Sequence, residues 1–125
     1  MGEIYKANCS CGWNTELFLG AGMNATNVRF IQNYLTEKDA VEFIEAFEKG
    51  LIKTFELSNV PYYSSENQTV GSISKLSYKL HNGQDIEIIG KCQSSKENIQ
   101  IINNDDILCP ICHNKVILEQ TGHWD

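Results

Sequence analysis

The sequence has no long apolar run, because no stretch approaches the roughly 18 consecutive apolar residues that suggest a membrane span. Its first residues, Met1 to Lys6, contain neither a basic start nor an apolar segment, so we expect no secretory signal. Lys6 also stands where N-myristoylation requires Ser or Thr. We therefore expect a cytoplasmic protein that does not associate with a membrane.

Positive charge is also scarce. The chain has 10 Lys and Arg residues against 16 Asp and Glu residues, so its formal net charge is −6. The basic residues are spread thinly along the sequence, whereas proteins that neutralise phosphates normally show a clustered basic face. This balance disfavours nucleic acid and favours a protein as the binding partner. We expect the protein itself to be a monomer.

The sequence shows no catalytic arrangement. No Ser-His-Asp or Cys-His pairing is legible. The segment Gly20-Ala21-Gly22 lacks the glycine spacing of a dinucleotide site and the Lys-Ser/Thr ending of a phosphate-binding loop. We therefore expect a protein that is not an enzyme. With 125 residues, 42% hydrophobic and 21% charged, the chain has the length and composition of a single domain, residues 1–125.

Cysteines are what the sequence does have. Their number, five, is odd, and a reducing cytosol argues against a disulfide framework. Four of them form two short turns, Cys9-Ser10-Cys11-Gly12 and Cys109-Pro110-Ile111-Cys112. Thiolate is the preferred protein donor for structural zinc, which takes four ligands in a tetrahedron. The spacing therefore predicts one Zn²⁺ ion held by Cys9, Cys11, Cys109 and Cys112.

The residues after each pair favour tight turns. Gly12 stands where such a turn needs a positive φ. After the second pair comes His113-Asn114, and we expect Asn114 to supply that conformation, since Asn tolerates positive φ better than most residues. Pro110 pre-sets one dihedral angle of the second turn.

These two turns resemble the knuckles of a zinc ribbon, and the whole pattern is similar to small uncharacterised bacterial-type proteins that begin with a Cys-x-Cys-Gly turn. The resemblance covers the two chain ends only, and residues 12–108 lie between the cysteine pairs. It implies a metal-stabilised clasp whose halves, 4–20 and 105–120, flank an inserted α+β segment, 24–104. Zinc ribbons occur in transcription, translation and nucleic-acid-processing proteins, so nucleic-acid binding stays as an alternative function.

A dithiol redox protein is a further alternative, because Cys109-Pro110-Ile111-Cys112 taken alone could be a redox pair. That chemistry requires a strand–helix context of thioredoxin type, whereas an apolar strand follows Cys112 here. Cys92 is most simply a buried small hydrophobe. His113 at the surface or His123 in a loose tail could each replace a cysteine as ligand, whereas His81 borders a turn and reads as a surface residue.

The remaining pattern predicts an α+β fold that is rich in antiparallel strands and has one principal helix. Thr36 caps a helix over 37–49, with an apolar stripe at helical spacing formed by Ala40, Phe43, Ile44 and Phe47. Residues 60–72, with Pro61 and Gly71, read as a loop. Strands are expected at 4–8, 13–19 and 99–102, on the two sides of the second cysteine turn at 107–108 and 116–118, and in a hairpin of 76–80 and 86–88 around Asn82-Gly83. Residues 103–106 read as a polar turn before the second cysteine pair. Residues 24–35 and 51–57 stay undecided.

Overall fold

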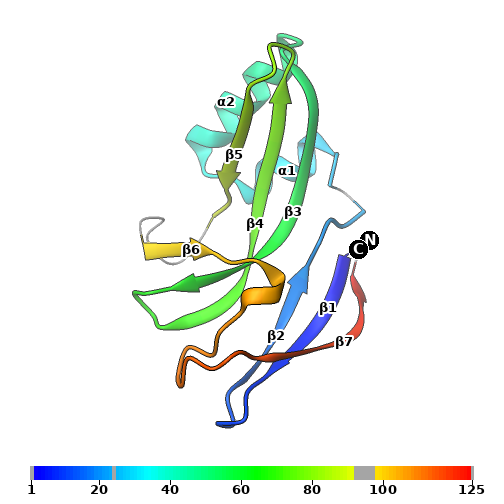
Figure 1. Cartoon of the computed structure of the whole chain (residues 1–125). Helices are drawn as coiled ribbons and strands as arrows, with labels where there is room; N and C mark the ends of the chain where they lie inside the picture. Colours follow the sequence, from blue (N-terminus) through cyan, green and yellow to red (C-terminus); the bar gives the residue numbers. More distant parts are fainter. Residues whose placement is uncertain (1, 24, 92–97, 125) are drawn as a thin grey trace.

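The computed structural model describes residues 2–23, 25–91 and 98–124, and it contains two antiparallel sheets (Figure 1). The first sheet has the order β2-β1-β7 and is formed by Gly2–Asn8 (β1), Asn14–Leu19 (β2) and Ile117–Trp124 (β7). The first and last strands of the chain therefore pair along their length, from Gly2 opposite Trp124 to Asn8 opposite Ile117. This pairing brings the residues after β1 close to the residues before β7.

The second sheet has the order β5-β4-β3-β6 and is formed by Ile52–Ser64 (β3), Thr69–Leu80 (β4), Asp85–Ile89 (β5) and Ile99–Ile101 (β6). Its long hairpin, β3–β4, reaches from the helices to the first sheet (Figure 1). Gly20 and Asn59 join the two sheets through a pair of backbone hydrogen bonds, with N···O distances of 3.0 and 2.8 Å.

Two α-helices lie between the sheets in sequence, Val28–Ile31 (α1) and Glu37–Glu48 (α2), with the 3-10 segment η1 (Gln32–Tyr34) joining them. The predicted helix is confirmed, since the Thr36 hydroxyl accepts a hydrogen bond from the Asp39 amide at 3.4 Å. Gly50 ends it with φ +70°, and the Leu51 amide donates to the Ala46 carbonyl. The expected α+β class holds only loosely, because strands dominate the fold.

The prediction of a loop over residues 60–72 was wrong, because β3 and β4 run through most of it. Pro61 is tolerated because its carbonyl accepts from Ile102 on the β6 side. In an antiparallel pair, the N–H and C=O of one residue point toward the same neighbouring strand. The nitrogen of Pro61 therefore faces the β6 side, and the N–H that proline lacks removes no hydrogen bond to β4. Gly71 stands opposite Tyr62, and a Cβ atom on Gly71 would lie 3.1 Å from the Tyr62 ring.

The prediction for the C-terminal end of the chain was also wrong. His123 was expected in a loose tail, but it lies in β7, opposite Glu3 of β1. Trp124 anchors the strand, because its indole Nε1–H donates to the Leu19 carbonyl at 2.9 Å. An amphipathic ring with a satisfied polar atom holds a terminal strand in place. A further 3-10 segment, η3 (Asn104–Asp106), occupies the predicted polar turn before the second cysteine pair.

Two buried clusters form the core. One gathers around the first sheet and includes Ala7, Leu17, Val70, Ile107 and Cys109. The other lies between α2 and the second sheet and is centred on the fully buried ring of Phe43. Among the described residues, no helix has the length and apolar character needed to cross a membrane.

Phe43→Ala should destabilise the helix-covered half of the molecule. The Phe43 ring lies 5.6 Å from the Phe55 ring and 5.5 Å from the Tyr78 ring, measured between centroids. Removing a buried aromatic ring typically costs about 3–5 kcal/mol of unfolding free energy. Val41→Ala, on the exposed face of the same helix, should change it by no more than about 0.5 kcal/mol. Urea unfolding of both variants measures the difference, and equal midpoints would contradict this packing.

Candidate metal centre

The first cysteine pair lies in the turn that joins β1 to β2. The Cys9 amide donates to the Trp13 carbonyl at 2.9 Å, and the Gly12 amide donates back to the Cys9 carbonyl at 3.0 Å. Gly12 has φ +99°, as predicted, and this conformation is open to glycine at little cost. The turn is closed by backbone hydrogen bonds within five residues, so its geometry is set locally.

The second pair lies in a turn of the same kind before β7. The Cys109 amide donates to the Asn114 carbonyl at 2.8 Å, and the His113 amide donates to the Cys109 carbonyl at 3.0 Å. His113, with φ +65°, takes the left-handed conformation that was expected of Asn114. The His113 amide closes the turn onto Cys109, which places the positive φ one residue earlier than predicted. Histidine, like asparagine, is enriched in this region.

The arms of the second turn differ from the prediction. A strand was expected before Cys109, but Leu108 makes only an isolated β-bridge, with Lys115. The strand after the turn begins at Ile117 and is longer than predicted, because β7 pairs with β1 up to Trp124. The second half of the clasp is therefore held by β1 as well as by its own turn.

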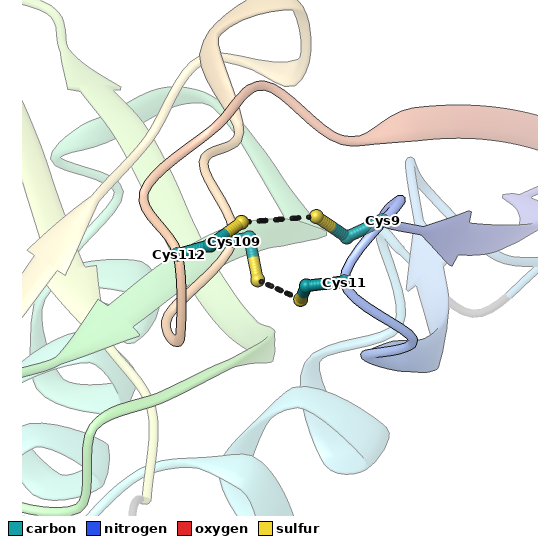
Figure 2. A group of neighbouring side chains, drawn as sticks. All are labelled: Cys9, Cys11, Cys109 and Cys112. Atoms are coloured by element: carbon teal, nitrogen blue, oxygen red, sulfur yellow. Dashed lines mark hydrogen bonds between the residues drawn. The ribbon is translucent and has the colours of Figure 1, made fainter.

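Figure 2 shows the four cysteine side chains pointing toward one another from the two turns. The Sγ atoms of Cys9 and Cys112 are 3.2 Å apart, and those of Cys11 and Cys109 are 3.6 Å apart. All four sulfurs lie within 4.8 Å of one another. Four sulfurs about 2.3 Å from one zinc ion would be separated by about 3.8 Å in a tetrahedron. The cluster could therefore hold a metal ion, as a zinc-ribbon-like site would.

Backbone amides of both turns act on two of the thiols and favour their charged form. The amide of Cys11, followed by the Cys112 side chain, lowers the pKa of the Cys9 thiol to about 6. Burial is the strongest influence on Cys109 and raises its pKa. The amides of Cys112 and Ile111, with the Cys11 side chain, outweigh burial and leave the pKa of Cys109 lowered. The Ile111 nitrogen is 3.4 Å from the Cys109 sulfur.

The pKa values of the other two thiols are shifted in the opposite direction, which favours their neutral form. The Trp13 amide favours the Cys11 thiolate, but burial and the three neighbouring thiols raise the pKa of Cys11 to about 12. Likewise, the Asn114 amide is outweighed by the Cys9 thiol and by burial, so the pKa of Cys112 is raised. Four negative charges this close repel one another. A divalent cation would remove that repulsion and let all four sulfurs ionise together.

Neither histidine joins the cluster. Within the described part of the chain, the only group of His, Cys, Asp and Glu side chains that could hold a metal consists of the four cysteines. His113 is exposed, as predicted, and His123 lies in β7. His81 is exposed beside its turn, as predicted. The prediction for Cys92 falls outside the described residues.

The sulfurs lie at the edge of the first core cluster, which sequence reasoning did not anticipate. Cys109 is fully buried, and Tyr63 of β3 and Trp13 of the first turn pack against the same cluster. Beside Cys109 is a cavity of about 340 Å³ whose lining is mainly apolar, with Gln100 and Asp106 among its residues. Tyr63 and Gln100 are paired across β3 and β6. No sequence signal could assign them to the site, because strand pairing alone brings them there.

The chain matches no protein-family model, no curated protein sequence and no solved structure. The site must therefore be interpreted from its own geometry, which is that of a four-cysteine cluster joining the two ends of the chain and able to hold a metal ion.

Proposed function

We propose that Cys9, Cys11, Cys109 and Cys112 hold one structural Zn²⁺ ion, and that this protein is a non-enzymatic, single-domain, cytoplasmic module that binds a protein partner. The convergence of four sulfurs within 4.8 Å, from opposite ends of the sequence, carries the metal part of the proposal. Tetrahedral four-thiolate sites hold zinc or iron, and in zinc proteins they are structural. Four protein ligands also leave no coordination position for a water molecule or a substrate.

Purified protein should contain close to one zinc per chain. The reason is the preformed set of four sulfurs, whose mutual repulsion a divalent cation relieves. Elemental analysis of freshly purified, reduced protein measures zinc and iron side by side. Iron in place of zinc would overturn the identity of the ion, and metal far below one equivalent would overturn the site itself.

Surface apolar residues near the second turn support a protein partner. Leu108, Ile111 and Ile117 are 50%, 65% and 72% exposed, and Leu108 also lines the cavity beside Cys109. Exposed apolar side chains are typical of the centre of a protein interface. We define these three residues as the knuckle patch.

The same region gives little support to nucleic-acid binding. Lys6 of β1 lies in register with Glu16 on one side and Glu119 on the other. In residues 2–23 and 98–124, acidic residues outnumber the lysines Lys6 and Lys115, and these acids are Glu3, Glu16, Asp105, Asp106 and Glu119. Nucleic-acid binding needs the opposite balance, because cations must neutralise phosphates.

A capture experiment with matched variants tests the partner. The purified wild-type protein, immobilised and incubated with native lysate, should capture a protein partner. The variant Ile111→Ser/Ile117→Ser should lose this partner. The control variant Val41→Ser/Leu51→Ser, which alters similarly exposed residues on and just after α2, should still capture it. Zinc analysis of both variants shows that the clasp is intact. Binding that nuclease treatment abolishes would favour the nucleic-acid alternative, and equal loss in both variants would remove the knuckle patch from the interface.

A further inference from the structure

Two sulfur–sulfur hydrogen bonds in the cluster join opposite ends of the chain. Cys9 lies 3.2 Å from Cys112 and Cys11 lies 3.6 Å from Cys109, and each contact links one turn to the other (Figure 2). The two sulfurs of each turn also lie within 4.8 Å of each other and influence one another's pKa, but these two sulfur–sulfur hydrogen bonds both run between the turns. The geometry therefore separates the four cysteines into two pairs that cross the site.

The geometry of the first turn disfavours a disulfide between its own two cysteines, Cys9 and Cys11. Cys9 and Cys11 are separated by one residue, and the turn is closed by the hydrogen bond from the Gly12 amide to the Cys9 carbonyl. A disulfide there would close a small ring, and disulfides with restricted geometry store strain. If Cys9 and Cys11 do not bond to each other, complete oxidation of the cluster must use both sulfurs of the second turn as their partners.

The sulfurs of Cys11 and Cys109 differ in their accessibility to solvent. Cys11 is exposed, whereas Cys109 is fully buried in the first core cluster. A small oxidant therefore reaches Cys11 from solvent, and the sulfur best placed to react next is the buried one 3.6 Å away. Proximity of this kind makes the second step effectively intramolecular.

We propose that the cluster is also an oxidation site, at which a peroxide converts the metal clasp into two disulfides, Cys9–Cys112 and Cys11–Cys109. This oxidation concerns the same four cysteines as the proposed zinc site and rests on that proposed function for the bound metal. The pairing itself depends on the positions of the sulfurs and not on the identity of the ion. The ends of the chain stay joined in both states, by the metal when the cysteines are reduced and by covalent bonds when they are oxidised. Only the bound metal is released.

The chemistry balances with hydrogen peroxide as the oxidant. In the metal-loaded clasp all four sulfurs are ionised, so the Cys11 thiolate can attack one peroxide oxygen; the O–O bond breaks, hydroxide leaves, and a sulfenic acid remains on Cys11. The Cys109 thiolate then attacks that sulfur, the S–O bond breaks with loss of a second hydroxide, and the S–S bond forms. Cys9 and Cys112 react in the same way with a second peroxide molecule. The metal, having lost its thiolate ligands, leaves as a cation.

Double variants can assign the pairing by mass, in a Cys92→Ser background. Trypsin leaves Cys9 and Cys11 together in residues 7–29, and Cys109 and Cys112 together in residues 97–115, so peptide masses of the wild type cannot separate the crossed pairings. Cys9→Ser/Cys112→Ser keeps the close pair of Cys11 and Cys109. Its matched control, Cys9→Ser/Cys109→Ser, keeps Cys11 and Cys112. Both variants lose two ligands, but the control also replaces the buried Cys109, so their rates are compared only where both are folded.

The close-pair variant should form its linked peptide at least about tenfold faster with hydrogen peroxide than the control, because oriented groups gain large effective concentrations. Equal rates would overturn the pairing if circular dichroism shows that both variants are folded. If either variant is unfolded, the pairing is instead assigned in oxidised Cys92→Ser protein. Mass-spectrometric fragmentation of its linked peptides between Cys9 and Cys11 shows which cysteine of the second turn each of them is bonded to. A Cys109–Cys112 bond, links between chains, or sulfonic acids alone would each overturn the inference.

These failures are distinguishable from failure of the proposed zinc site. Wild-type protein without metal refutes the zinc proposal and leaves the pairing test valid. A metal-loaded protein that oxidises to other products refutes only the pairing. A zinc-sensitive dye in the wild-type reaction should report metal release together with loss of free thiols.

Discussion

Cys109→Ser is expected to abolish metal binding and to loosen both ends of the chain. Cys109 is buried, and its sulfur accepts hydrogen bonds from the amides of the second turn. A serine hydroxyl is not a thiolate donor, and altering even an outer partner of a ligand weakens zinc binding roughly 10–100-fold. We therefore expect a loss of more than about 100-fold in zinc affinity. Metal content per chain and the thermal unfolding midpoint measure the two effects.

Cys11→Ser gives a second test from the opposite end of the chain. It should lose metal to the same extent as Cys109→Ser, although Cys11 is exposed and removing it leaves no cavity in the core. Cys92→Ser is the control and should leave metal content unchanged. If all three variants lost metal equally, the ligand assignment would be wrong. If Cys11→Ser alone kept full metal content, a fourth ligand other than Cys11 would be required.

Chelation of the metal should release both ends of the chain together. Metal binding at this site couples to folding, because the four ligands are brought together only in the folded chain. A metal chelator should therefore expose Lys6 in β1 and Lys115 in the second turn to trypsin. Cleavage after Lys38 and Lys49, at α2, should come later, because that helix packs on the separate cluster around Phe43. Cleavage should start within residues 1–20 and 105–125.

Time-resolved mass analysis of the digest, with and without chelator, orders the cuts, and a sizing column reports the oligomeric state. We expect a monomer in both conditions. A dimer that chelator dissociates would mean that each cysteine pair contributes half of a site between two chains. No change with chelator would favour the dithiol alternative. Simultaneous cleavage at Lys38 and Lys6 would show that the two core clusters unfold as one unit.

Several features could be predicted from short-range patterns because local interactions determine them. The helix over α2 depends on Thr36, on an apolar stripe and on Gly50, all within one segment. The positive φ of Gly12 and the turn around Cys9 and Cys11 likewise depend on neighbouring residues. The strands around Asn82-Gly83 were predicted by alternation and turn chemistry.

The longest hairpin was missed for an equally physical reason. Pro61 and Gly71 usually interrupt strands, and the sequence does not show which neighbour each residue faces. Pro61 is acceptable because its ring nitrogen lies away from β4, and Gly71 because the Tyr62 ring covers the space that a side chain would fill. Likewise, His123 and Trp124 belong to a strand only because β1 pairs with them. Tertiary context overrode local preference at these positions.

The two cysteine turns, their spacing and their suitability for thiolate chemistry could be read from residues 9–12 and 109–112 alone. Their convergence could only be inferred, since residues 12–108 separate them. Closing a loop of this length costs conformational entropy, and the short cysteine motifs do not contain the contacts that offset this cost. In the folded chain, the pairing of β1 with β7 supplies that closure and aligns Asn8 with Ile117. The crossed sulfur contacts, the burial of Cys109 and the adjacent cavity follow from that register and from the packing of Tyr63. Such features depend on contacts between strands distant in the chain, and tertiary packing alone decides them.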